Sequence, residues 1–193
     1  MRLFIAIELP LQVIEHLDKL CRALRSDAEL VDSVLRFVAL ESAHLTLKFL
    51  GEVDDARLPE VKTALSTVKI KPLRLSAVEM LYLPKKGPVH VIGVRVGGEV
   101  DRLNLLHEQI ERSCESIQPK REDRVFLPHI TLARWRPGPS SSRLSGIRAK
   151  TLSHLFPGPA FEARGFRLIQ SILGADGAKH TVLETFSTNP NIS

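Results

Sequence analysis

Two short segments of the chain share a pattern of side chains that could carry acid–base chemistry. HLTL occupies residues 44–47 and HITL occupies residues 129–132, so in each a threonine follows two positions after a histidine. Because side chains alternate between the two faces of a β-strand, each segment would present its imidazole and hydroxyl on one face. The apolar residues between them would face a core. The pattern therefore predicts two rigid platforms, each displaying one His and one Thr.

The chemistry that suits two such platforms is cleavage of a phosphodiester without a metal ion. In-line displacement at phosphorus needs a base for the attacking oxygen and an acid for the leaving oxygen, and imidazole can serve as either near neutral pH. Threonine hydroxyls can donate hydrogen bonds to the non-bridging oxygens, where charge accumulates. We therefore predict His44 and His129 as catalytic residues and Thr46 and Thr131 as phosphate ligands. The pattern leaves open that both histidines are ordinary strand residues.

Composition limits the class of protein. The chain has 193 residues, of which 44% are hydrophobic, which suits one domain over residues 1–193 or two tightly joined lobes. Lys and Arg number 27 against 22 Asp and Glu, and this modest excess favours anionic ligands such as phosphates or RNA. We expect a cytoplasmic protein, because the opening RLFIAIELP lacks a cleavable leader and no apolar run approaches the roughly 20 residues of a membrane span.

The cysteines and histidines give no metal-binding pattern. Cys21 and Cys114 both fall in stretches with the periodicity of amphipathic helices, and neither has a second Cys or a His at ligand spacing. Free thiols in a core are the expectation, which fits a reducing cytoplasm. We predict no metal and no cofactor, and the alternative is a zinc site in which a third histidine joins His44 and His129.

Periodicity and turn signals predict an α+β fold in which antiparallel hairpins are frequent. The residues 34–38 and 44–50 are expected to pair around a short turn, and PGPSSSR at 137–143 is typical of a loop. The two halves form a rough internal repeat with the His-bearing strands in equivalent places. Strands are expected at 2–8, 34–38, 44–50, 73–83, 89–96, 125–135, about 161–173 and 180–187, and helices at 10–27, 54–68 and 99–117.

The sequence also resembles a known family. HLTLKFLGEV and FLPHITLAR are similar to the two signatures of the two-histidine (2H) phosphoesterase superfamily, most of all its RNA 2′,3′-cyclic phosphodiesterases, historically called 2′-5′ RNA ligases. MRLFIAIELP resembles the family's opening strand and QSILGADGAKHTVLETF its closing hairpin, so the likeness covers nearly the whole chain. It implies a bilobal fold, in which two pseudo-symmetric lobes with antiparallel sheets face a central groove and carry their helices outside.

The resemblance also implies an activity. RNA ending in a 2′,3′-cyclic phosphate, or a small cyclic nucleotide, would be opened by water to a 2′-phosphate and a free 3′-hydroxyl. His44 would protonate the departing O3′ and His129 would activate water, although the opposite assignment fits equally well. Arg134 matches a family position suited to the phosphate, while a surface arginine at a strand end is the alternative. The protein is expected to be a monomer, and 2′-5′ RNA end ligation or non-catalytic RNA binding are the rival functions.

Other residues near the motifs are weaker candidates. Regular alternation would put Lys48 on the face of the first histidine, where it could contact the substrate, and Phe49 behind it in the core. The alternative is that the Phe49 ring stacks on a base. Trp135 could stack on a base or serve in packing. His180, which stands where the family commonly has Tyr, is expected to be structural because its neighbouring threonine would lie on the opposite face of a strand.

Overall fold

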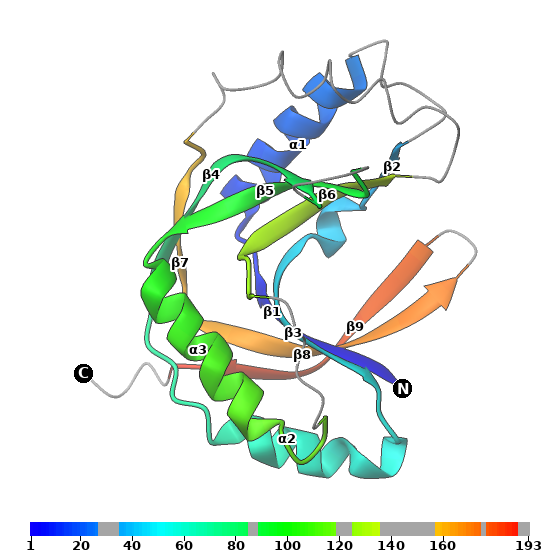
Figure 1. Ribbon diagram of the computed structural model, residues 1–193, viewed down its shortest axis with the longest axis vertical. Coiled ribbons are helices and arrows are strands. Elements are labelled where there is room, and N and C mark those ends of the chain that lie inside the picture. Colours follow the sequence, from blue (N-terminus) through cyan, green and yellow to red (C-terminus); the bar gives the residue numbers. More distant parts are fainter. Residues whose placement is uncertain (27–34, 85–88, 119–124, 136–156, 175–176, 189–193) are drawn as a thin grey trace.

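The structure of the protein is a computed structural model that describes residues 1–26, 35–84, 89–118, 125–135, 157–174 and 177–188 (Figure 1). The strands are β1 (Arg2–Glu8), β2 (Leu35–Phe37), β3 (His44–Glu52), β4 (Leu73–Leu83), β5 (Val91–Gly98), β6 (His129–Trp135), β7 (Ala160–Ala163), β8 (Gly165–Gly174) and β9 (Gly177–Ser187). The helices are α1 (Leu11–Ser26), α2 (Leu58–Ser66) and α3 (Val100–Ser113), with the 3₁₀ turns η1 (Leu40–Ser42) and η2 (Asp55–Arg57).

The strands form one curled, nine-stranded antiparallel sheet, so the fold is α+β as predicted. Its order is β7-β4-β5-β6-β3-β1-β8-β9, with β2 beside β6. The two halves, β7-β4-β5-β6 and β3-β1-β8-β9, meet where Leu45 of β3 pairs with Ile130 of β6. The two sheets expected from the sequence are therefore halves of a single sheet, and the two motif strands form the seam between them.

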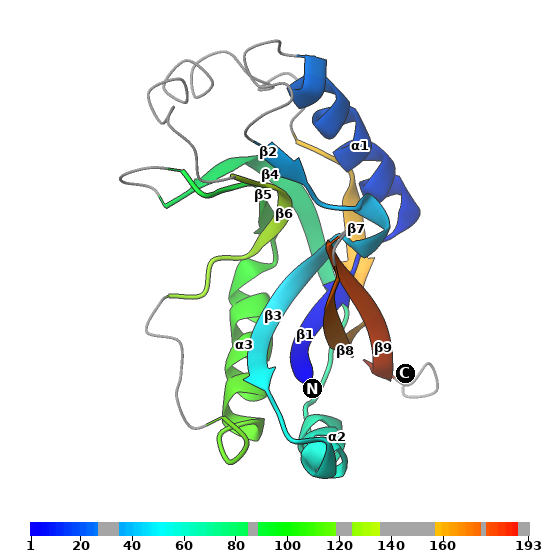
Figure 2. The same ribbon diagram turned by 90° about the vertical axis from the view of Figure 1, so that its right-hand side faces the viewer.

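The helices cover the outside of this sheet, one set on each half (Figures 1 and 2). Helix α1 lies on the first half: the Gln12 amide donates to the Ala160 carbonyl of β7 at 3.1 Å, and the Arg25 guanidinium stacks 4.5 Å from the Phe37 ring of β2. Helices α2 and α3 lie on the second half, where α3 contacts β3 and α2 contacts β9. The motif strands are thus backed by helices on one face only.

Hydrophobic periodicity explains which helix faces are buried. Every third or fourth residue of α1 and α3 is apolar, which gives each helix one apolar stripe that packs on the sheet. The two cysteines are buried in this core as free thiols. In the described part of the chain, no helix is both long and apolar enough to cross a membrane. The fully buried helix residues include Val13, Leu17, Leu20 and Leu24 of α1 and Leu103 and Ile110 of α3.

Two expectations about the strands were wrong. The segments 34–38 and 44–50 do not pair with each other. Instead β2 and β3 both lie along the same edge of β6, with η1 between them, because the β6 edge offers backbone partners to each. The strand expected at 161–173 is two strands, β7 paired with β4 and β8 paired with β1 and β9. The predicted loop at 137–143 lies outside the described residues.

Candidate active site

The two histidine motifs lie side by side on adjacent antiparallel strands. From the Leu45–Ile130 pair, one step along each strand in opposite directions leads to His44 on β3 and Thr131 on β6. The other direction leads to Thr46 and His129. Leu45 and Ile130 are fully buried, while the four motif side chains are partly exposed. The alternation predicted for the two HxT segments is confirmed, and the seam brings them together.

Both imidazoles are held in the same way. The His44 Nδ1 lies 2.7 Å from the Ser42 carbonyl oxygen, and the His129 Nδ1 lies 2.7 Å from the Leu127 carbonyl oxygen. A carbonyl can only accept, so each Nδ1 must carry the hydrogen and donate it. In the neutral imidazole Nε2 is then the unprotonated nitrogen, free to take or return a proton. Each half of the sheet therefore supplies one oriented proton carrier.

The electrostatic surroundings of His44 favour its neutral form. Burial lowers the pKa of His44 to about 4, and the hydrogen bond to the Ser42 carbonyl opposes this shift only in part. The nearby positive charges of His180, Arg134 and His129 lower the pKa further, in that order. The same interactions show that the second motif and its arginine lie close to the first histidine.

A β-bulge changes the face of the residues after the first motif. Along β1, Ala6 pairs with Thr46 while the next residue, Ile5, pairs with Lys48, so Leu47 is an extra residue in β3. Lys48 is consequently turned inward, where it is 5% exposed and its Nζ donates to both carboxylate oxygens of Glu111 on α3 at 2.8 Å. The prediction that Lys48 lies on the histidine face and contacts the substrate was wrong, because it assumed unbroken alternation.

The same bulge brings Phe49 onto the histidine face. Its side chain is 45% exposed, and its ring lies 6.0 Å from the ring of Phe4 on β1. The Phe4 ring in turn lies 4.7 Å from the His44 imidazole. The prediction of Phe49 as a core residue was therefore wrong for the same reason.

The second motif is followed by an equivalent bulge. Gly93 of β5 pairs with Thr131 and Ile92 pairs with Ala133, so Leu132 is the extra residue in β6. Arg134 therefore returns to the face of His129 and Thr131, and its side chain is exposed. The close approach requires glycine at position 93, where a Cβ atom would lie 2.5 Å from the Ile130 carbonyl oxygen. The structure thus places Arg134 beside the motif residues.

Two residues that sequence reasoning did not assign to the site lie in it. The His180 ring of β9 packs edge-on against the His44 ring with centroids 5.2 Å apart, and it lies 5.0 Å from Phe4. Arg36 of β2 pairs directly with Arg134. The family position normally held by Tyr was the available signal for His180, whereas nothing in the pattern indicated that β2 would pair with β6. The side chain of Trp135 is outside the described residues, so its contact with substrate stays a prediction.

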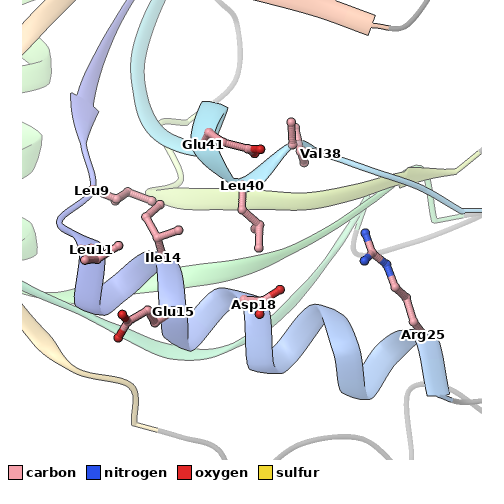
Figure 3. A pocket seen from close by; sticks show the side chains of 10 residues that line it. Leu9, Leu11, Ile14, Glu15, Asp18, Arg25, Val38, Leu40 and Glu41 are labelled. Atoms are coloured by element: carbon pink, nitrogen blue, oxygen red, sulfur yellow. The ribbon is translucent and has the colours of Figure 1, made fainter.

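A groove of about 740 Å³ lies elsewhere, between α1 and η1 (Figure 3). None of the HxT residues lines it, and its three carboxylates against one arginine do not suit a phosphate ester. The motif seam is therefore the better candidate for the active site. Among the described residues, no group of three or more His, Cys, Asp or Glu side chains is placed to hold a metal ion. The groove is lined by Leu9, Leu11, Ile14, Glu15, Asp18, Arg25, Val38, Ala39, Leu40 and Glu41.

Two HxT strands at the seam of a curled antiparallel sheet define a two-histidine phosphoesterase. A family described as LigT like Phosphoesterase matches residues 7–92. The RNA 2′,3′-cyclic phosphodiesterase of Archaeoglobus fulgidus is 31% identical over 189 residues, which is 96% of this chain and 99% of that protein. The chain therefore belongs to the RNA 2′,3′-cyclic phosphodiesterase family of LigT-like phosphoesterases.

Solved structures share this fold. The crystal structure of TT0787 from Thermus thermophilus is 28% identical with a TM-score of 0.78, covering 97% of both chains. That of E. coli LigT complexed with 3′-AMP has the same fold at 24% identity, with a TM-score of 0.67, and covers 96% of this chain and 97% of that one. The fold expected from the resemblance is confirmed, with the sheet continuous across the seam.

Proposed function

We propose that this protein hydrolyses 2′,3′-cyclic phosphate ends of RNA to 2′-phosphates by two-histidine acid–base catalysis. His44 and His129 are the proton carriers, and Thr46, Thr131 and Arg134 hold the phosphate. The observation that carries the proposal is the matched pair of imidazoles, each fixed through Nδ1 to a carbonyl two residues earlier. Non-catalytic RNA binding would not require two oriented Nε2 atoms, so the geometry favours an enzyme.

The atoms of the reaction balance without another reactant. Water attacks phosphorus while one Nε2 takes its proton, the P–O3′ bond breaks, and the other imidazole protonates O3′. The threonine hydroxyls and the Arg134 guanidinium donate hydrogen bonds to the non-bridging oxygens as charge builds on them. The products are a 2′-phosphate and a 3′-hydroxyl.

The low pKa of His44 bears on how the two roles are divided. Near pH 7 the unliganded His44 imidazole is neutral, and this form can accept a proton from water directly. To protonate O3′ instead, His44 must gain a proton as substrate binds, and a phosphate anion held at Thr46 and Thr131 would favour that uptake. Proton uptake on binding a 2′-phosphorylated nucleotide, measured calorimetrically in buffers of different ionisation enthalpy, separates the two assignments.

The test of the function uses an oligoribonucleotide ending in a 2′,3′-cyclic phosphate, with EDTA present. We expect conversion to the 2′-phosphate, with turnover reduced at least about 100-fold in His44→Ala and in His129→Ala. The exposed His90, which precedes β5, gives a matched control, and His90→Ala should retain activity. Folded wild-type protein that binds the oligonucleotide without turnover would support a binding module. Joined 2′-5′ ends would instead support the ligase alternative.

We further propose a monomeric, single-domain protein of the cytoplasm that needs no metal or cofactor. The two buried free thiols support a reducing compartment, because neither cysteine is placed in a disulfide. Sedimentation velocity tests the oligomeric state. Full activity after exhaustive EDTA treatment supports the metal-independent reaction, and its loss with restoration by a divalent ion would contradict it.

A further inference from the structure

Two arginines stand directly opposite each other at the far end of the histidine face. Strand β2 pairs antiparallel with β6, and in this register Arg36 is the partner of Arg134. Cross-strand partners lie on the same face of a sheet, with Cβ atoms about 5 Å apart. Because the bulge in β6 returns Arg134 to the face of Thr131, Arg36 lies on that face too.

The residue after Arg36 supports this orientation from the other side of the sheet. The Phe37 ring packs on the core and meets the guanidinium of Arg25 from α1 at 4.5 Å. Since α1 covers the outer face of the sheet, the preceding side chain points to the opposite, inner face. Arg36 is exposed there. A backbone hydrogen bond from Val38 to the Leu132 carbonyl at 2.8 Å fixes the strand that carries it.

Neither arginine has an acidic partner among the residues that the structure describes. By contrast, the strand arginines Arg95 and Arg167 pair with Glu79 and Glu8. Like charges directly opposite each other on neighbouring strands destabilise a sheet. Two unpaired guanidinium groups on the face of the two histidines therefore form a site for an anion.

We propose that Arg36 binds a backbone phosphate of the RNA chain next to the cyclic end held by Arg134. This inference rests on the proposed function and names its substrate class, a polynucleotide chain and not a mononucleotide. Arg134 lies five residues after His129, and its charge lowers the pKa of His44, so it lies nearer the reacting phosphate. Arg36 lies on the same face, on the neighbouring strand β2. A guanidinium is suited to phosphate oxygens because its N–H groups form a planar fork.

The test compares two substrates in wild-type protein and in Arg36→Gln: a 2′,3′-cyclic mononucleotide and an oligoribonucleotide with the same cyclic end. We expect kcat/KM to fall about 10-fold on the oligonucleotide, because one charged hydrogen bond is lost, and less than about twofold on the mononucleotide. In a plot of the logarithm of the oligonucleotide binding constant against the logarithm of salt concentration, the steepness of the slope should decrease by about one. Arg36→Lys should restore the slope. Arg112→Gln on α3, whose arginine pairs with Glu108, is the matched control.

A charge reversal tests the geometry separately from chemistry. Arg36→Glu would place a carboxylate opposite Arg134, so its melting temperature should equal or exceed that of wild-type protein while oligonucleotide affinity falls furthest. In Arg36→Gln, equal changes on both substrates, or no change on either, would overturn the proposal. Affinity for a 2′-phosphate-ended oligonucleotide is measured by fluorescence anisotropy. That readout remains informative if the wild-type protein proves inactive, so failure of the proposed function and failure of this inference are distinguished.

Discussion

Phe49 and Arg134 occupy equivalent positions in the two motif strands, five residues after the motif histidine. Each is returned to the histidine face by a β-bulge directly after the motif threonine. The partner strands match as well, because the small residues Ala6 and Gly93 stand opposite Thr46 and Thr131. The backbone of the site is thus nearly two-fold symmetric, whereas its side chains are aromatic in one half and cationic in the other.

This asymmetry predicts different effects for the two positions. Arg134→Ala should lower kcat/KM about 10- to 100-fold on any 2′,3′-cyclic phosphate, because a charged hydrogen bond to the reacting phosphate is lost. Phe49→Ala removes an exposed ring and should lower kcat/KM less than about fivefold, mainly through KM. Steady-state kinetics with a cyclic mononucleotide measures both. Equal losses in kcat would show that the aromatic position also serves the chemical step.

The low pKa of His44 predicts a pH dependence of stability. The His44 imidazole has a pKa of 6.5 in the unfolded chain and of about 4 in the folded protein, so the unfolded chain binds the proton more tightly. The contribution of His44 is fully present above pH 6.5 and is lost as the pH falls toward 4. It amounts to about 3 kcal/mol of unfolding free energy. Urea unfolding at pH 7 and pH 4 should show wild-type protein losing that much more than His44→Gln, which does not titrate.

The edge-on contact of His180 with His44 predicts a coupled titration. Burial also lowers the pKa of His180, and two imidazolium groups at this separation repel. His180→Phe keeps a ring against Phe4 but removes the charge, so the pKa of His44 should rise by about 0.5–1 pH unit. Proton NMR of the His44 ring measures the shift. Thr181→Val on the opposite face is the control and should leave the pKa of His44 unchanged. An unchanged titration midpoint of His44 in His180→Phe would rule out coupling.

The sequence was sufficient to locate the face that carries the two histidines but not the edges of that face. Periodicity identified the helices, and the HxT spacing correctly predicted that His44 and Thr46 share a face with buried leucines behind them. The β-bulges could not be predicted, because a bulge depends on which strand pairs with which and shifts every later side chain to the other face. For that reason, the sheet faces predicted for Lys48 and Phe49 were the reverse of those in the structure.

Long-range pairing explains the residues that were missed. Arg36 enters the site only because β2 pairs with β6, about 100 residues further along the chain, instead of with the next strand. His180 enters because the β8–β9 hairpin is added beside β1, which places its ring over Phe4. Local signals of turn and periodicity carry no information about either arrangement.

The inward Lys48 predicts a large stability effect for a residue next to the first HxT motif. Its ion pair with Glu111 is almost buried, and one turn earlier on α3 the His107 Nδ1 donates to the Leu47 carbonyl at 2.9 Å. Together these contacts give partners to the Leu47 carbonyl and the Lys48 ammonium. Glu111→Ala leaves a buried ammonium without a partner and should cost about 3–5 kcal/mol of unfolding free energy.

Replacing both Lys48 and Glu111 separates the effect of losing the ion pair from the cost of burying one charge without a partner. Lys48→Met with Glu111→Leu should recover most of the stability lost in Glu111→Ala, because an apolar pair of similar volume needs no partner. The exposed pair Glu108–Arg112 on the same helix is the control, and breaking it should cost less than about 1 kcal/mol. Urea unfolding of these variants beside wild-type protein completes the comparison. If the double variant is as unstable as Glu111→Ala, then packing of the bulge, and not the buried charge, determines the loss.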